Sequence, residues 1–197
     1  HDSGERAIYS LDKEFITISL LWANYLIANA ALIRDFCYWR LALYLQAKNP
    51  NVPDIPNKLI KPSQRNSLSK QRAFWDIVIN EVGPIKCIYT GKLLQPDDYA
   101  VEHFIPYSFV SHDLIWNLIP AEGQFNSKKG DKLPKLEVYF DPFYNIQKGA
   151  VEVMLEKHPR HPLLEDYFTI SSTFEDLMTP AKYYSHLHPL IMIASNN

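Results

Sequence analysis

One run of polar residues between positions 101 and 134 constrains this chain more than any other part of its 197 residues. A carboxylate adjoins a histidine in an otherwise apolar stretch, an asparagine follows fourteen positions later, and a second asparagine follows nine positions after that. Such side chains can hold a divalent cation against a phosphodiester and activate a water beside it. In order they are Glu102, His103, Asn117, Asn126, Lys128, Lys129 and Lys132.

The residues around this run predict two short strands followed by a helix. Alternating and β-branched residues favour strands over 85–89 and 99–104, with a turn-rich segment between them. A helix is expected to start near 124–128. Because neighbouring side chains on a strand point to opposite faces, Glu102 and His103 can address one site only at a bulge or at a strand end.

In its residues and spacing, the run from Val101 to Pro134 resembles the ββα-metal core of HNH endonucleases, including the HNH domain of CRISPR nucleases. The resemblance implies that His103 is the general base and that Glu102 and Asn126 are metal ligands. Asn117 takes the place of the residue that braces the histidine loop. Lys129 falls where several relatives keep a lysine near the scissile phosphate, and Mg²⁺ or Mn²⁺ is the implied cofactor.

The chain departs from the family pattern at two places. Many HNH proteins hold a structural zinc with two Cys-x-x-Cys pairs, but here the corresponding positions are Cys87 with Thr90 and Glu122 with Phe125. We therefore expect no structural zinc and expect Phe125 to fill that volume. Glu102 stands where Asp is more common, and its added methylene moves the carboxylate by about 1.5 Å. Glu102 is then expected to reach a metal through a water, or to favour Mn²⁺.

Composition places the chain among folded globular proteins: 47% of its residues are hydrophobic, 21% are charged and 13% are aromatic. The net charge of −2 provides no global attraction for nucleic acid, so phosphate contacts must come from local patches. Two cysteines, Cys37 and Cys87, make no disulfide framework, and no signal peptide is visible at residues 1–10. These features predict a cytoplasmic protein.

The segment 15–33 contains no charged residue. A hydropathy scan would mark it as a membrane span, but four polar residues interrupt it, and we expect one helix that continues through the charged residues 34–40. We predict a buried core helix, or a surface for a protein partner or self-association, rather than a span.

A basic segment over 58–72 contains five cationic residues and no acidic one. It is either a solvated linker that leads into a helix or an arm that contacts phosphates, and the sequence leaves both open. The candidate nucleic-acid contacts here are Arg65, Lys70 and Arg72.

The flanking regions are predicted to be mostly helical. Ser67 or Ser69 can cap a helix that runs to Val82, with Gly83-Pro84 as its stop, and 142–157 has helical periodicity. The expected fold is α+β, mostly helical with a small ββα-metal core. The expected domains are 1–83, helical with the basic arm; 84–140, the nuclease core; and 141–197, a helical extension.

Two functions from different classes fit these observations. The first is a metal-dependent endonuclease that hydrolyses phosphodiester bonds of DNA, as an effector or subunit of a prokaryotic defence system, a setting that rests on family analogy. The second is a catalytically silent HNH-fold protein that binds nucleic acid or acts as a scaffold in a larger complex. The absent zinc ligands and Glu102 motivate the second.

Overall fold

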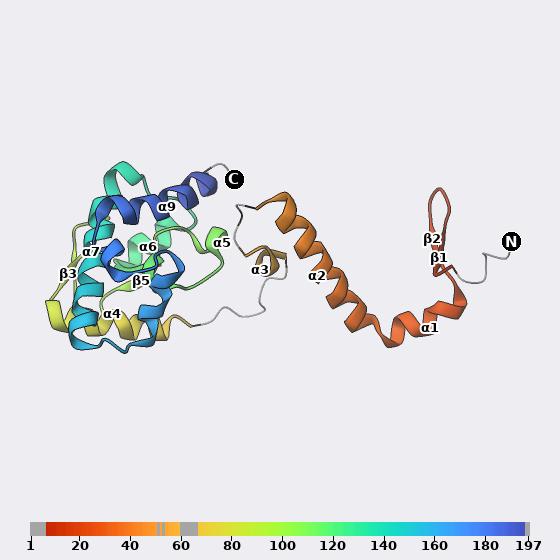
Figure 1. Cartoon of the computed structure of the whole chain (residues 1–197), viewed down its shortest axis with the longest axis horizontal. Helices are drawn as coiled ribbons and strands as arrows, with labels where there is room; N and C mark the ends of the chain where they lie inside the picture. Colours follow the sequence, from red (N-terminus) through yellow and green to blue (C-terminus); the bar gives the residue numbers. More distant parts are fainter. Residues whose placement is uncertain (1–6, 51, 53, 60–66, 196–197) are drawn as a thin grey trace. The chain divides into compact units, whose positions relative to one another are not determined.

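The structure is a computed structural model that describes residues 7–50, 52, 54–59 and 67–195. The chain divides into two compact units, His1–Pro50 and Asn51–Asn197, and each is described here by itself (Figure 1). The domain boundaries expected after 83 and 140 do not coincide with this division. The helix over 69–82 and the helix that begins at 136 share one core with the residues between them.

The first unit is a strand hairpin followed by two helices. Its strands pair in antiparallel register, with Tyr9 opposite Ile18. The expectation of one helix from residue 15 onward is wrong, because 16–18 lies in the hairpin and Asn29 separates two helices. The amide of Asn29 donates to the Tyr25 carbonyl at 3.0 Å and closes the first helix. The elements are β1 Tyr9–Leu11, β2 Ile16–Ile18, α1 Leu20–Ala28 and α2 Ala30–Lys48.

Large apolar side chains of the first unit stay exposed. Leu20 is 90% exposed, and Leu21 and Ile27 are each 75% exposed, whereas Ala42 alone is buried in α1 and α2. Among the residues that the structure describes, no helix combines the length and apolar character needed to cross a bilayer.

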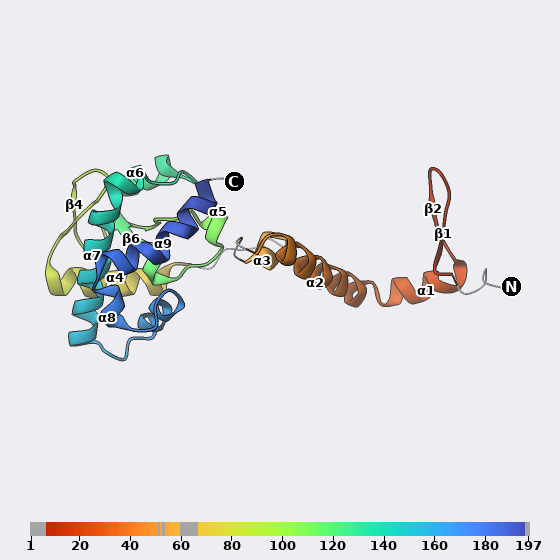
Figure 2. The same ribbon diagram turned by 45° about the horizontal axis from the view of Figure 1, so that its top comes forward.

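The second unit is mostly helical with two small antiparallel sheets, which confirms the predicted fold class. Figures 1 and 2 show α4, α7 and α9 around the short strands. The elements are α3 Ile55–Leu59, α4 Ser69–Val82, β3 Ile85–Lys86, β4 Leu93–Leu94, β5 Ala100–His103, α5 Tyr107–Val110, the 3₁₀ turn η1 Ile115–Asn117, β6 Leu118–Ala121, α6 Gly123–Lys129, α7 Leu136–Lys157, the 3₁₀ segment η2 Pro162–Thr169, α8 Phe174–Leu177 and α9 Pro180–Ser195.

Helix α4 spans the predicted range and ends where Gly83 adopts φ +84°, a conformation that favours glycine. Its buried face comprises Phe74, Trp75, Val78 and Ile79, whereas Val82 at its C-terminal end is 51% exposed. The helix packs against α7 and β6. This contact supports β6, the strand that pairs with the strand carrying Glu102 and His103.

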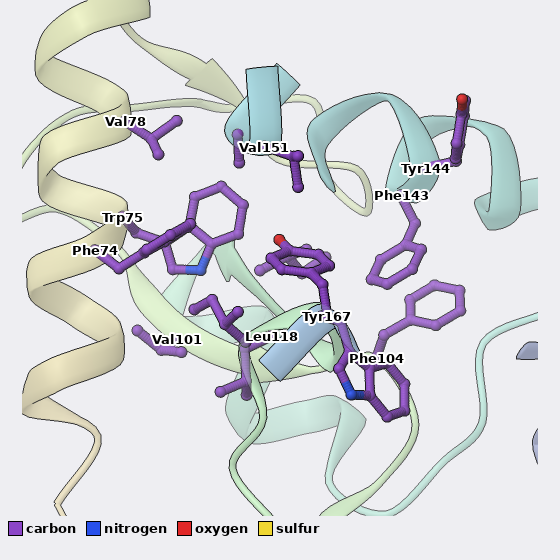
Figure 3. Close-up of a cluster of buried hydrophobic side chains, with 14 of the residues drawn as sticks. Phe74, Trp75, Val78, Val101, Phe104, Leu118, Phe143, Tyr144, Val151 and Tyr167 are labelled. Carbon is purple, nitrogen blue, oxygen red and sulfur yellow. The ribbon is translucent and has the colours of Figure 1, made fainter. Parts of the chain in front are cut away.

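Helix α7 begins at Leu136, before the predicted start, and contains Pro142. A proline inside a helix removes one backbone hydrogen bond, at a cost of roughly 3 kcal/mol. Buried aromatic residues on both sides, Phe140 and Phe143, anchor the helix across this position. Phe143 stacks on Phe104 with ring centroids 4.0 Å apart, so α7 directly supports the residue after His103 (Figure 3).

A buried polar network ties α7 to the corner between η1 and β6. The amide nitrogen of Gln147, which is completely buried, donates to the carbonyls of Ile115 at 3.2 Å and Leu118 at 2.8 Å. Its oxygen accepts from the hydroxyl of Tyr167 at 2.6 Å. Because buried carbonyls are costly to leave without a donor, this network fixes the backbone on both sides of Asn117.

We predict that Gln147→Leu destabilises the protein by about 2–3 kcal/mol, because it leaves two carbonyls and one hydroxyl buried without their partner. Tyr167→Phe, which removes only the hydroxyl, should cost about 1 kcal/mol. The measurement is urea unfolding followed by tryptophan fluorescence, with the exposed Gln124→Leu on α6 as the control. Equal midpoints for Gln147→Leu and the control would contradict the role of the network.

Candidate active site

Strand β5 carries the first two candidate residues and ends on the second. It pairs antiparallel with β6, with Glu102 opposite Ile119 and His103 opposite Leu118. Its partner is therefore a strand that the sequence reading did not predict. The strand predicted over 85–89 is only the two-residue β3, and it pairs with β4. His103 is the last residue of β5, which is the strand end that the chemistry requires.

Asn117 joins the two ends of the segment that follows the histidine. Its Oδ1 accepts from the amide of Ile105 at 2.8 Å, and its Nδ2 donates to the carbonyl of the same residue at 2.8 Å. The carbonyl of Asn117 accepts from the amide of Phe104 at 2.8 Å. The side chain is completely buried. These three hydrogen bonds, which we call the Asn117 clasp, close the loop that carries His103.

The ring of His103 faces Asp113. Its Nε2 lies 2.9 Å from Asp113 Oδ1, and the two side chains are 9% and 18% exposed. The ring of Tyr107 packs edge-on against the imidazole, with centroids 5.5 Å apart. Asp113 is not among the residues that the sequence predicts for the site. It lies ten residues after His103 and matches no motif spacing. The turn at α5 and η1 brings the two side chains together only in the folded protein.

The carboxylate of Glu102 faces α6 instead. Lys129 Nζ lies 2.6 Å from Glu102 Oε1, and both side chains are buried, at 5% and 6% exposure. The same ammonium donates to the carbonyl of His103 at 2.9 Å. Glu102 and His103 thus engage different neighbours, as alternation along a strand requires. Lys129 links α6 to both residues.

Asn126 lies half-buried on α6, which packs against β5. The carboxylate of Glu102 and the amide oxygen of Asn126 are hard oxygen donors, so their chemistry fits Mg²⁺ or Mn²⁺. Among the described residues, no group of three His, Cys, Asp or Glu side chains could hold a metal ion. A cation here would need asparagine, water or substrate oxygens beside Glu102, and it would share that carboxylate with Lys129.

The remaining predicted contacts lie at different places. Lys128 and Lys132 are exposed at the end of α6 and just after it, and Lys70 is exposed near the start of α4. Arg72 donates to the carbonyl of Tyr99 at 2.7 Å and stacks over its ring at 4.7 Å, so its guanidinium supports the fold. Arg65 lies outside the described residues.

The positions that correspond to zinc ligands in many relatives hold Cys87, Thr90, Glu122 and Phe125. Cys87 Sγ accepts from the amide of Glu122 at 3.5 Å, which joins the two segments. Tyr89 stacks on Phe125 with centroids 4.5 Å apart and planes 15° apart. Hydrogen bonding with Thr90 and with the Glu122 amide lowers the pKa of Cys87, although burial acts in the opposite direction. Hydrogen bonding and ring stacking therefore hold these two segments together.

Comparison with protein families matches residues 87–135 to the family described as HNH endonuclease. This segment belongs to the HNH family. No curated protein and no solved structure gives a significant match to the chain. The HNH segment contains β4, β5, β6 and α6, and all four residues of the two contacts at the site, His103 with Asp113 and Glu102 with Lys129. An HNH domain indicates a nuclease that binds nucleic acid and uses a divalent metal ion.

His112, beside Asp113, is held neutral by its surroundings. Burial, and secondarily the nearby His103, lower the pKa of His112 from 6.5 to about 4, although Asp113 acts in the opposite direction. Its ring packs against Trp116 with centroids 5.3 Å apart. The unfolded chain therefore binds a proton between pH 6.5 and 4 that the folded HNH segment does not bind.

We predict that stability falls as the pH decreases from about 6.5 to 4, by an amount on the order of 2 kcal/mol attributable to His112. Above pH 6.5 the ring is neutral in both states and contributes no pH dependence. His112→Gln should flatten the decline, whereas the exposed control His158→Gln should retain it. The measurement is urea unfolding at a series of pH values. A decline of the same steepness in His112→Gln would remove His112 as its source.

Proposed function

We propose that this protein is a metal-dependent endonuclease that hydrolyses phosphodiester bonds of DNA. The observation that carries the proposal is the part-buried His103–Asp113 pair at the end of β5, where Glu102 directly precedes His103, all within the HNH segment. An imidazole oriented by a carboxylate and adjoining an acidic residue has the parts needed to deprotonate a water beside a bound cation.

His103 is the proposed general base. When Nε2 carries the proton that Asp113 accepts, the lone pair of the neutral ring lies on Nδ1, which takes the proton of the attacking water. Asp113 orients the ring and stabilises the imidazolium that forms. The Asn117 clasp keeps the loop, and with it the ring, in one position.

Glu102 and Asn126 are the proposed metal ligands, and Lys129 is a proposed contact to the scissile phosphate. A bound Mg²⁺ or Mn²⁺ would neutralise charge on the phosphate and on the leaving oxygen. Lys129 donates to the backbone of His103, so its ammonium lies beside the catalytic strand. We further propose Lys128, Lys132, Lys70 and Arg65 as contacts to the nucleic-acid backbone, whereas the guanidinium of Arg72 is engaged by Tyr99.

A second function is favoured by one observation, the Glu102–Lys129 ion pair. An ammonium 2.6 Å from Glu102 already neutralises the carboxylate that a metal would need. A protein that keeps this pair permanently would bind nucleic acid through the HNH fold, or act as a scaffold, without cleaving. Plasmid cleavage separates the two functions.

We predict that the protein nicks or linearises plasmid DNA with Mg²⁺ or Mn²⁺ and that His103→Ala lowers the rate at least about a hundredfold, since a general base contributes roughly 10²–10⁴. Asp113→Asn should lower the rate less, about tenfold, because the ring persists without its carboxylate partner. His158→Ala, an exposed histidine outside the HNH segment, is the matched control. Agarose electrophoresis provides the measurement.

Circular dichroism of each variant establishes that the fold is intact. Cleavage at equal rates by wild type and His103→Ala would rule out His103 as the base. DNA binding without cleavage under both metals would favour the silent function instead.

The first unit is proposed to serve assembly rather than catalysis. Its exposed residues on α1 and α2, Leu20, Leu21, Ile27 and Leu32, lie in the segment 15–33 and offer an apolar surface to a protein partner or a second copy. By family analogy the protein is an effector or subunit of a prokaryotic defence system in the cytoplasm.

We predict that the purified protein associates with itself in a concentration-dependent way and that Leu21→Gln with Ile27→Gln weakens the association, because apolar surface drives it. Light scattering after size-exclusion chromatography is the measurement. Leu93→Gln, a residue of the second unit that is 60% exposed, is the control. A monomer at every concentration, with no binding of an apolar dye to the first unit, would contradict an assembly role for this surface.

A further inference from the structure

A hollow of about 500 Å³ lies between α6, the start of α7 and the turn that carries Tyr89. Figure 2 shows α6 and α7 at this part of the second unit. We call this hollow the lysine–tyrosine pocket. Its lining residues are Tyr89, Phe125, Lys128, Lys129, Lys132, Leu133, Pro134, Lys135, Val138 and Tyr139.

The rim of the pocket is cationic. Four of the lining residues are lysines and none is acidic. Lys129 is turned toward Glu102, whereas Lys128, Lys132 and Lys135 are exposed, and within the described part of the chain none of these three forms an ion pair. Because an exposed patch of one sign attracts an opposite charge, the pocket favours an anionic ligand.

The wall of the pocket is aromatic and held in place. Tyr89 stacks on Phe125 and contacts Tyr139, with centroids 5.1 Å apart. The turn of Tyr89 is closed by the amide of Gly91, which donates to the carbonyl of Cys87 at 2.9 Å. Among the described residues, the buried hydroxyl of Tyr89 has no hydrogen-bond partner. The wall therefore offers flat apolar surface to a ligand.

We propose that the lysine–tyrosine pocket binds one nucleotide unit, with the base against the aromatic wall and the phosphate at Lys128, Lys132 and Lys135. An inorganic anion would make no use of the rings, and an apolar ligand would make no use of the lysines. A nucleotide uses both, because every base has a π face that stacks on aromatic side chains and every phosphate attracts lysine.

Lys129 connects this pocket with the candidate active site, since it lines the pocket and its ammonium contacts Glu102. A nucleotide of the bound strand that flanks the scissile phosphate would have this chemistry, as would a free mononucleotide. The assignment to the strand rests on the proposed nuclease function. The binding of a free nucleotide does not.

The test measures binding in metal-free buffer, where no cleavage occurs. A fluorescein-labelled single-stranded oligonucleotide is titrated with the full chain by anisotropy, and adenosine monophosphate is titrated by calorimetry. Tyr139→Leu should weaken binding about tenfold through lost stacking. Lys132→Gln should weaken it about threefold to fivefold and lower the slope of log K against log salt by about 1.

Two matched controls lie outside the pocket: Tyr184→Leu, a half-exposed ring on α9, and Lys148→Gln, an exposed lysine on α7. Loss with the oligonucleotide alone assigns the pocket to the bound strand, and loss with adenosine monophosphate assigns it to a free nucleotide. If wild type binds neither probe, or if Lys132→Gln and Tyr139→Leu bind like the controls, the proposal is overturned.

Plasmid cleavage measured in parallel separates this proposal from the nuclease function. Binding that both pocket variants weaken, without any cleavage, would support the pocket proposal and contradict the nuclease function. Cleavage, together with wild-type binding affinity in both pocket variants, would support the nuclease function and overturn the pocket proposal.

Discussion

The Asn117 clasp is the interaction on which the candidate active site depends. Its three hydrogen bonds join Phe104 and Ile105 to Asn117 and close the loop of eleven residues, 106–116, between them. The clasp fixes the start of this loop against its end, and the loop carries Asp113 to its 2.9 Å contact with His103. Gln147 supports the same corner from α7, since it binds the carbonyls on either side of Asn117. The catalytic geometry is thus supported by completely buried amides.

The ion pair between Glu102 and Lys129 is also buried, but it places two charges, rather than neutral amides, away from water. Removing two charges from water costs several kcal/mol per ion, and the attraction between them roughly offsets that cost. Such a pair adds little net stability, but loss of one partner would cost about 3–5 kcal/mol. The pair mainly fixes the position of the Lys129 ammonium, which also donates to the backbone of His103. A cation that binds Glu102 finds the carboxylate already placed, and it must share it with Lys129.

The local parts of the fold could be predicted from the sequence, and the long-range parts could not. Helix α4 follows from its apolar periodicity and from its stop at Gly83, and α6 ends at Gly130. The predicted capping by Ser67 or Ser69 is wrong, because Leu68 is the N-cap of α4 and makes no side-chain cap hydrogen bond. The spacing from His103 to Asn126 pointed to the HNH family, and the match over 87–135 confirms that family. Strand β6 was missed because Leu118–Ala121 is buried throughout and shows no alternation. Asp113 was missed because only the folded turn brings it to His103, and the hairpin of β1 and β2 was missed because apolar composition alone does not distinguish strand from helix.

The contacts at the positions that hold zinc in many relatives determine the chemical character of one face of the HNH segment. Four thiolates around a metal would occupy that volume and tie the segment before β4 to the start of α6. Here the amide of Glu122 bonds to Cys87 Sγ, and the stack of Tyr89 on Phe125 provides the remaining contact. Aromatic pairs contribute about 0.5–1.5 kcal/mol beyond their buried area, much less than a structural metal. The core of α4 and α7 must therefore supply the stability, and the partly buried rings of Tyr89 and Phe125 line the same hollow as the lysines of α6.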